Sequence, residues 1–357
     1  MASSYGMKYK LTLFGESHGS GVGIVIDGIP AGFKIDFEEI RLQMARRRPG
    51  LHKNTTTRVE RDEAKILSGY YNEHCTGAPL TAFIESTNIR PKDYSIFAKN
   101  PRPGHADYSA WVKYNGFNDI RGGGMFSGRL TAPIVFAGVI AKQILRQKGI
   151  TIGGHIMQVG NIKDTTFNPL GEPAQKLNIL GTQAFPVCDK DIGETMQNKV
   201  AKLKESGDSI GGIVECMAIG LNAGVGDPFF NSIESTVAHL AFSIPGVKGI
   251  EFGKGFELAK MQGSNSNDCY KYENGKVITT SNFNGGVLGG ISTGMPIIYR
   301  TVFKATSSIA IKQNTINLEN KENTELQVEG RHDPCIVLRA VPVMESVLAI
   351  ALLDLII

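Results

Sequence analysis

Cysteine is sparse in this 357-residue chain, and its placement excludes several kinds of site. The five cysteines are scattered, odd in number and include no C-x-x-C pair. This pattern argues against a disulfide framework and favours reduced thiols in a cytosolic compartment. The seven histidines are equally dispersed, and none lies three or four residues from another. We therefore expect no metal site, because zinc motifs usually place their ligands at short, regular spacings.

Neither end of the chain carries a long apolar segment. The first residues, MASSYGMKYK, contain no apolar core of a signal peptide. The segment VLAIALLDLII at the other end is interrupted by Asp354 and is much shorter than the roughly 20 residues that a membrane span needs. We expect a soluble, cytoplasmic protein that does not bind a membrane.

Strong net charge is absent as well, since the formal charge is +4 and the sequence pI is about 8.7. Nucleic-acid-binding domains usually exceed a pI of about 9. Seven basic residues do concentrate between Arg41 and Arg61, against a single acid. Arg46 to Arg48 suit the negative end of a helix dipole, but the density favours a small polyanionic ligand over RNA, because no interleaved aromatics are present to stack bases. A basic RNA-binding protein is kept as an alternative.

No low-complexity linker divides the chain, so we expect one large domain. The segments 23–32 (GIVIDGIPAG) and 212–224 (GIVECMAIGLNAG) resemble each other and suggest two related halves. The alternation of apolar and polar residues over 9–13 is typical of a half-buried strand, and 22–26 favours a second strand.

Three helices are expected. The first follows an N-cap at Asp36, where Glu39 completes a capping box. The second runs over 131–148, and the third from Pro342 into the apolar C-terminus, because proline is tolerated in a first helical turn. The polar segment 312–325 is expected to be a surface loop.

The stretch GESHG, residues 15–19, matches the G-x-S-x-G pattern of serine hydrolases. A nucleophile elbow needs a strand, a strained turn that carries the serine, and then a helix. The glycines and β-branched residues that follow favour a strand instead of a helix. We therefore interpret GESHG as a loop between two strands that presents Ser17 and His18. On these residues alone, a hydrolase with Ser17 as its nucleophile stays open as an alternative.

Two further stretches suit anionic ligands and proton transfer. RPGHADY sets Arg102 and His105 around a proline-glycine turn, and histidine exchanges protons near neutral pH. RGGGMFSGRLTAP brings Ser127 and Arg129 to the start of the helix at 131, where backbone N–H groups favour anions.

The C-terminal third supplies three more candidate stretches. The segments 284–296 and 304–308 offer glycine turns and hydroxyl groups, which suit a cofactor phosphate or a polar ring. GRHDPC places Arg331, His332 and Asp333 just before the C-terminal helix, although an arginine beside a carboxylate is often a simple ion pair.

Together these stretches resemble the chorismate synthase family, nearly from end to end. The matching strings, in order, are GESHG, RRRPG, AKILSG, RPGHADY, RGGG with Ser127 and Arg129, GDSIGG, VKGIEFGKGF, GGVLGGIS with TSSI, and GRHDPC with RAVPV. Members of this family are carbon-oxygen lyases that convert 5-O-(1-carboxyvinyl)-3-phosphoshikimate to chorismate, the last step of the shikimate pathway. The reaction is an anti 1,4-elimination of phosphate that requires reduced FMN without net redox change.

The resemblance also implies roles for individual residues. His18 would be the acid associated with the reduced flavin, and His105 would protonate the departing phosphate. Ser17 and Ser127 would support the hydrogen-bond network, and Asp333 would help to relay the proton through flavin N5. The implied substrate clamps are Arg48, Arg102, Arg129 and Arg331. The implied FMN contacts are Met125, Phe126, Ser127, Pro245, Gly246, Gly289, Lys304, Ala305, Thr306, Ser307, Ser308 and Arg331.

The chain departs from the usual family pattern at several positions, which the resemblance predicts to affect flavin contacts more than the reaction. The departures are Met125 for arginine, Phe126 for serine, Leu130 for glutamate, Pro245-Gly246 for Asn-Ala, Ala305 for proline and Asn54 for a basic residue.

The family likeness implies an α+β fold, a βαβ sandwich of antiparallel sheets and helices in one large domain. It further implies a homotetramer in which each subunit binds FMN and a small anionic substrate. No dinucleotide fingerprint is visible, so we expect reduction of the flavin by an external flavin reductase. NADPH would enter only if the enzyme had a flavin reductase activity of its own.

Overall fold

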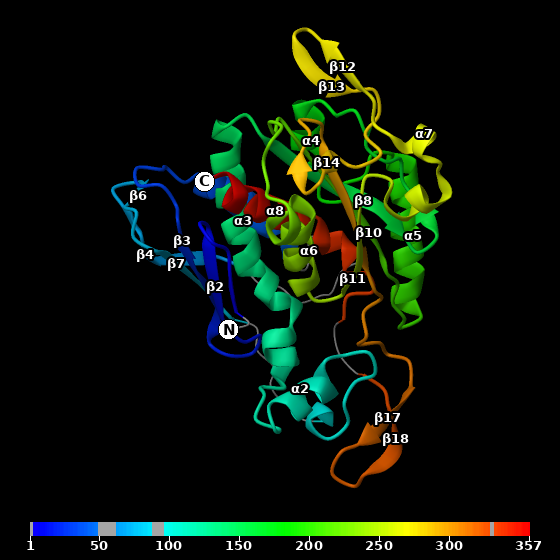
Figure 1. Ribbon diagram of the computed structural model, residues 1–357. Coiled ribbons are helices and arrows are strands. Elements are labelled where there is room, and N and C mark those ends of the chain that lie inside the picture. Colours follow the sequence, from blue (N-terminus) through cyan, green and yellow to red (C-terminus); the bar gives the residue numbers. More distant parts are fainter. Residues whose placement is uncertain (1–2, 49–61, 88–95, 329–331) are drawn as a thin grey trace.

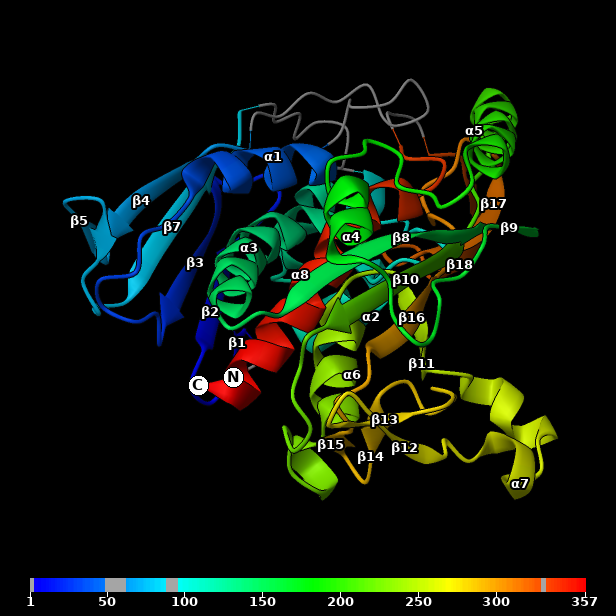
Figure 2. The same cartoon turned by 90° about the horizontal axis from the view of Figure 1, so that it is seen from above.

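The computed structural model describes residues 3–48, 62–87, 96–328 and 332–357. Figures 1 and 2 show a layered molecule in which long helices lie between two antiparallel sheets. This arrangement confirms the expected α+β sandwich. Asn54, Arg331 and the basic residues after Arg48 up to Arg61 lie outside the described residues.

The first sheet has the strand order β1-β2-β3-β7-β4, with all neighbouring strands antiparallel. The expected alternation holds, because Leu11 is buried while its neighbours Lys10 and Thr12 are exposed. The expected second strand is β3, and the GESHG stretch forms the turn before it. The strands of this region are β1 Ser4–Tyr5, β2 Lys10–Gly15, β3 Gly21–Asp27, β4 Ala64–Ser68, β5 Tyr70–Tyr71, β6 His74–Cys75 and β7 Leu80–Glu85.

The second sheet has the order β11-β16-β10-β8-β9 and is also antiparallel. Three small hairpins project from the second half of the chain, and Figure 1 shows two of them at opposite ends of the molecule. The strands are β8 Thr151–Val159, β9 Ile162–Lys163, β10 Gly212–Ile219, β11 Val247–Phe252, β12 Tyr270–Glu273, β13 Lys276–Thr279, β14 Val287–Leu288, β15 Ile291–Ser292, β16 Ile297–Phe303, β17 Gln313–Asn317 and β18 Glu322–Leu326.

Two long helices, α3 and α8, pack against each other between the sheets (Figure 2). The segment Gly128–Gln147, which contains α3, is apolar enough to cross a membrane, but 89% of its apolar window is buried inside the protein, so α3 is a core helix. The helices are α1 Phe37–Arg47, α2 Asp107–Lys113, α3 Thr131–Gln147, α4 Ala174–Leu180, α5 Lys190–Glu205, α6 Ile233–Ser243, α7 Gly263–Ser266 and α8 Val337–Ile356.

The expected N-cap of α1 is present, but only half of the expected capping box forms. The Asp36 carboxylate accepts a hydrogen bond from the backbone N–H of Glu39 at 3.0 Å. The backbone N–H of Asp36 donates to Gln143 Oε1 instead of to Glu39. The Glu39 carboxylate binds Arg146 of α3, so contacts between helices replace the local reciprocal bond.

The C-terminal helix begins earlier than expected, because α8 starts at Val337 and Pro342 lies inside it. Proline lacks the N–H that would bond four residues back, which weakens a helix interior. The residues around Pro342 are buried in the core, and this packing outweighs the local cost.

The expectation of a surface loop at 312–325 is wrong, because these residues form the β17–β18 hairpin. The hairpin is anchored to the segment before α2. Thr315 Oγ1 donates to the carbonyl of Pro101 at 2.5 Å, and the Leu318 N–H donates to the carbonyl of Lys99 at 2.8 Å. Polar residues therefore form a local pair of strands here, and the segment that anchors the hairpin is distant in sequence.

The two large sheets share one strand order. The run β2-β3-β7-β4 of the first sheet corresponds to β8-β10-β16-β11 of the second. In each sheet the second strand of the run precedes an 11-residue helix, α1 or α6, and the third precedes a long central helix, α3 or α8. The similar segments 23–32 and 212–224 begin in the corresponding strands β3 and β10. Two related halves would be expected to show this arrangement. That the two halves are related remains a prediction.

Candidate functional site

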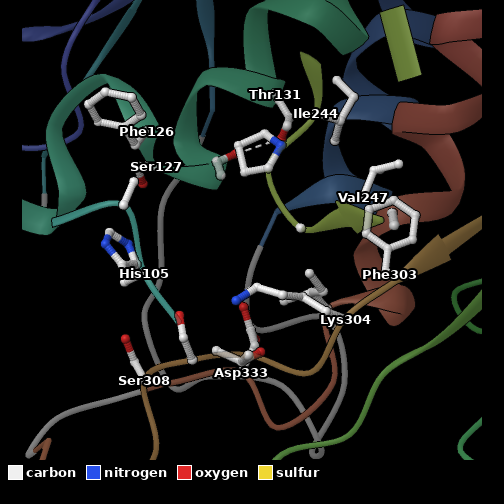
Figure 3. Close-up of a pocket in the computed structure, with 18 of the residues that line it drawn as sticks. His105, Phe126, Ser127, Thr131, Ile244, Val247, Phe303, Lys304, Ser308 and Asp333 are labelled. Atoms are coloured by element: carbon white, nitrogen blue, oxygen red, sulfur yellow. Dashed lines mark hydrogen bonds between the residues drawn. The ribbon is translucent and has the colours of Figure 1, made fainter. Parts of the chain in front are cut away.

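A cavity of about 710 Å³ lies where several loops converge beside the helical layer. Its walls come from the turn before α2, the glycine-rich segment before α3, the α6–β11 turn, the segment after β16 and the start of α8. Figure 3 shows His105 and Ser127 on one side of this space and Lys304 with Asp333 on another. Loops that are distant in the sequence thus bring polar groups together, as binding sites commonly do.

His105 is oriented by a neighbouring carboxylate. Its Nδ1 lies 2.5 Å from Asp107 Oδ1, a distance at which Nδ1 must carry a proton and donate it. Arg102 Nη2 is 3.1 Å from the same nitrogen, but it has its own acceptor in Asp107 Oδ1 at 2.8 Å. The Nε2 atom of His105 is therefore the ring nitrogen left for a ligand, and the side chain is 19% exposed.

Asp107 also fixes Arg102, so that one carboxylate holds both predicted residues of the RPGHADY turn. Arg102 donates from Nε to Asp107 Oδ2 at 2.8 Å and from Nη1 to Ser308 Oγ at 3.1 Å. Burial by itself raises the pKa of Asp107, but the hydrogen bonds from Arg102 and His105 outweigh it and hold the pKa well below its usual value. Asp107 is thus a carboxylate at neutral pH.

The glycine-rich segment, the 3₁₀ helix Arg121–Phe126, owes its shape to three consecutive glycines with positive φ. A Cβ on Gly122 would lie 2.0 Å from Nδ1 of His18, so this glycine allows a very close approach. Ser17 and His18 lie directly behind Gly122, only 0% and 3% exposed, with Ser17 Oγ 3.3 Å from His18 Nδ1. The GESHG loop therefore supports the cavity wall from behind.

Ser127 caps the next helical turn, where its Oγ accepts the N–H of Arg129 at 3.3 Å. Arg129 is 5% exposed and shares the buried carboxylate of Asp62 with Arg47. Burial opposes ionisation of Asp62, but the two guanidinium groups outweigh it and lower the pKa of Asp62. Two arginines around one carboxylate leave one positive charge at this edge of the cavity.

The opposite edge carries two lysines, Lys248 and Lys304. Lys304 Nζ donates to the carbonyl of Gly104, in the turn that carries His105. Burial, and secondly the charge of Lys248, lower the pKa of Lys304. Asp333 lies at the same edge, paired with Arg339 of α8.

Three comparisons with known proteins bear on this site. A family model described as chorismate synthase matches residues 9–357. Curated relatives named chorismate synthase include one from Lancefieldella parvula, 43% identical over 99% of this chain and 96% of the relative, and one from Thermococcus gammatolerans, 45% identical over 98% and 96%. A crystal structure of chorismate synthase superposes with a TM-score of 0.76 at 26% identity, covering 98% of this chain and 92% of that one.

The chain belongs to the chorismate synthase family. This confirms the resemblance read from the motifs, and with it the chorismate synthase fold and a lyase of aromatic biosynthesis. The comparisons support neither the serine hydrolase nor the RNA-binding alternative. The structure also argues against the hydrolase, because Ser17 is fully buried and the element that follows it is a strand and not a helix.

Most site residues expected from the chorismate synthase resemblance line the cavity. Those that do are His105, Ser127, Arg102, Arg129, Asp333, Met125, Phe126, Pro245, Gly246 and the run from Lys304 to Ser308. Ser17 and His18 are not among the described residues that line the cavity; they lie against Gly122, which does line it. Gly289 lies in the β14–β15 turn and does not line this cavity. Arg331 lies outside the described residues.

Arg48 is not among the described residues that line the cavity, whereas its neighbour Arg47 is. Successive helical residues point about 100° apart, so the sequence of three arginines did not reveal which one faces the site. Arg46 turns into the core and pairs with Glu345 at 3.0 Å.

Sequence reasoning missed four charged residues of the site: Arg47, Asp107, Lys248 and Arg339. All four stood inside strings already matched to the family, namely RRRPG, RPGHADY, VKGIEFGKGF and RAVPV. The signal was present, but their contacts with His105, Lys304 and Asp333 depend on the fold.

Proposed function

We propose that this cavity carries out the chorismate synthase reaction, the anti 1,4-elimination of phosphate from 5-O-(1-carboxyvinyl)-3-phosphoshikimate, with reduced FMN as its cofactor. The observation that carries the proposal is the pair His105 and Asp107, which places a proton-transferring imidazole among cations at a cavity. The substrate has a phosphate and two carboxylates, and these anions match cations such as Arg47 and Lys248 along the edges.

The residues present fit a flavin mononucleotide. Phe126 and Ile244 offer apolar surface for a ring system, and Lys304 offers a cation for a phosphate. The hydroxyl oxygen of Thr306 is buried at the wall and has no hydrogen-bond partner among the described residues, as is typical of a group that awaits a ligand. Met125 supplies a thioether where the family pattern has an arginine, so we expect apolar contact with the ring in place of one ionic contact.

Bound FMN, when reduced, supplies transient electron density that eases the breaking of an allylic C–O bond. The chain's own contribution is proton transfer and charge. Asp107 accepts the hydrogen bond from Nδ1, so Nε2 is the nitrogen that faces the ligand. His105 then delivers a proton from Nε2 to the leaving phosphate, which turns a poor leaving group into a good one. Lys248 stabilises the negative charge that collects on that phosphate.

His18 lies behind Gly122 with its Nδ1 close to Ser17 Oγ. We assign it the second proton-transfer role, next to the flavin, and Ser17 and Ser127 the support of the network. Asp333, paired with Arg339, is assigned to the proton relay. Arg48, Arg331 and Gly289 are kept as ligand contacts on the family likeness alone.

The remaining assignments are proposals supported by the family likeness, except for the external reductase, which is supported by the lack of a dinucleotide fingerprint in the sequence. The enzyme works in the cytoplasm as a homotetramer, with FMN in each subunit and an external flavin reductase as the source of electrons. NADPH is a co-substrate only if the chain reduces its own flavin.

Anaerobic turnover of the substrate tests the proposal, with phosphate release and chorismate absorbance followed in parallel. Product with chemically reduced FMN alone indicates a monofunctional synthase that depends on an external reductase. Product with oxidised FMN plus NADPH as well indicates an intrinsic flavin reductase. Folded protein that forms no product in either reaction contradicts the proposed function.

A further inference from the structure

A second cluster of polar side chains is buried on the outer face of the second sheet, away from the cavity. His155 of β8 and Glu215 of β10 are direct cross-strand neighbours. Asp164 and Cys188 belong to the long connection between these strands, which covers the same face. His155, Asp164 and Glu215 have fully buried side chains, and the cavity described above includes none of these residues.

Three atoms of this cluster are spaced as ligands of one metal ion. His155 Nδ1 is 3.1 Å from Asp164 Oδ2 and 3.7 Å from Cys188 Sγ, and the three atoms lie within 4.8 Å of one another. Tetrahedral zinc, with bonds of about 2.0–2.3 Å to nitrogen, oxygen and sulfur, places such atoms roughly 3.3–3.6 Å apart. The two separations from His155 Nδ1 need shifts of only a few tenths of an ångström, and the third, between Asp164 Oδ2 and Cys188 Sγ, is at most 4.8 Å.

The groups around these atoms are those that usually orient metal ligands. His155 Nε2 lies 2.9 Å from Glu215 Oε2, and Arg300 Nε holds the other oxygen of Glu215 at 2.8 Å. A carboxylate that accepts one imidazole N–H presents the opposite nitrogen to a metal. The Asp164 carboxylate is fixed in turn by backbone N–H groups, among them that of Cys188 at 2.6 Å.

The charge of the cluster also suits an exchange of protons for a cation. Because His155 lies between two carboxylates, it carries protons on both nitrogens. A divalent ion would take the place of the Nδ1 proton, since metal binding to such ligands releases protons. The pair of Glu215 and Arg300 would stay in place on the other side of the ring.

We propose that His155 Nδ1, Asp164 Oδ2 and Cys188 Sγ form a binding site for a divalent transition-metal ion, with zinc as the favoured ion. The partly exposed position of Cys188 leaves the fourth coordination position to water. The site joins the β8–β10 connection to the sheet beneath it, just before the N-cap Asp189 of α5. It is independent of the proposed reaction.

Cobalt titration of the full-length, chelator-treated protein tests this inference under anaerobic conditions. We expect a near-ultraviolet thiolate-to-cobalt absorption that saturates at one ion per chain and disappears when Zn²⁺ is added. The Cys188→Ser variant loses the absorption, whereas Cys269→Ser, which removes an exposed thiol, retains it. Absence of the band from folded wild-type protein, or its survival in Cys188→Ser, overturns the inference.

A second measurement avoids variants altogether. Alkylation of Cys188 by iodoacetamide, followed by mass spectrometry, should slow at least tenfold when Zn²⁺ is present, while alkylation of Cys269 continues unchanged. Equal rates at Cys188 with and without Zn²⁺ would mean that the cluster is only a hydrogen-bonded imidazolium.

Discussion

The hydrogen bond between His105 and Asp107 determines which nitrogen of the imidazole meets a ligand. Asp107→Asn removes the charge that holds the Nδ1 proton and leaves the Arg102 guanidinium without its counter-ion. We expect kcat to fall about 10- to 100-fold with a smaller change in KM, because a general acid contributes about 10²- to 10⁴-fold and misorientation removes part of that.

The control for this prediction is Glu319→Gln, which breaks an exposed ion pair with Lys99 near the same turn and should be neutral. Steady-state kinetics over a range of pH, together with a melting curve for each variant, separates an effect on proton transfer from an effect on folding. A folded Asp107→Asn enzyme with wild-type kcat would remove Asp107 from the mechanism.

Lys304 is expected to hold the flavin phosphate. Lys304→Met should weaken FMN binding about 10- to 100-fold, as expected for a charge-assisted hydrogen bond worth about 1.5–3 kcal/mol. Since burial and then Lys248 lower the pKa of Lys304, its charge is lost at a lower pH than that of an ordinary lysine. Wild-type affinity should therefore fall as the pH rises through this lowered pKa.

Fluorescence titration of FMN into each protein measures this affinity without turnover. Lys312→Met, which removes an exposed lysine paired with Glu325, is the matched control and should bind FMN normally. Equal dissociation constants for Lys304→Met and wild type would place the phosphate elsewhere in the cavity.

At the residue scale, the sequence predicts which residues belong to the site better than it predicts where their side chains point. His105, Ser127 and Asp333 were predicted and line the cavity. The family resemblance implied Arg48, whereas Arg47 lines the cavity; the sequence could not separate the two, because the direction of each arginine in the run depends on where the helix ends. The partner of His105 stood two residues away in RPGHADY, but only the tight turn brings its carboxylate to Nδ1.

At the scale of elements, the crossing of α3 and α8 depends on one glycine. A Cβ on Gly138 would lie 2.1 Å from Cβ and 2.5 Å from Cα of Ser346, so the two helices must separate to admit it. Gly138→Ala should destabilise the protein by about 1–3 kcal/mol, the usual cost of overpacking, despite the better helix propensity of alanine.

Urea unfolding at one protein concentration measures this change in the free energy of unfolding. Gly263→Ala serves as the control, because a Cβ there meets no atom within 4 Å and the residue begins the short exposed helix α7. A Gly138→Ala protein as stable as wild type would show that the helices do not pack as closely as described.

Elements with a strong internal pattern were predictable, and elements stabilised by distant partners were not. The helix at 131 and the strands around GESHG agree with the expectation because their apolar periodicity is local. The β17–β18 hairpin could not be predicted from its sequence, because its residues are polar. The segment that anchors it, at Lys99 and Pro101, is over 200 residues away in the chain. The start of α8 was misplaced because burial overrides the local effect of Pro342.

At the scale of the whole molecule, a buried charge cluster connects three helices. Glu345 of α8 binds Arg46 of α1 at 3.0 Å and Lys142 of α3 at 2.8 Å, and its side chain is 1% exposed. No local sequence pattern predicts this cluster, because its members are separated by about 100 to 300 positions. Glu345→Gln leaves two buried cations without a counter-charge and should destabilise the protein by about 3–5 kcal/mol.

The pH dependence distinguishes this electrostatic cause from a packing defect. Burial raises the pKa of Glu345, but Arg46 and Lys142 outweigh it, so the pKa in the folded protein lies below that of the unfolded chain. The stabilisation by Glu345 is then complete above the unfolded pKa of about 4.3 and is lost as the pH falls through the folded value. Unfolding free energies measured from pH 7 to well below the unfolded pKa of about 4.3 should therefore show a wild-type advantage over Glu345→Gln that is nearly constant above that pKa and narrows below it. Glu273→Gln, in an exposed pair with Lys271, should show no such difference at any pH. A constant difference between wild type and Glu345→Gln would indicate that shape, not charge, makes Glu345 stabilising.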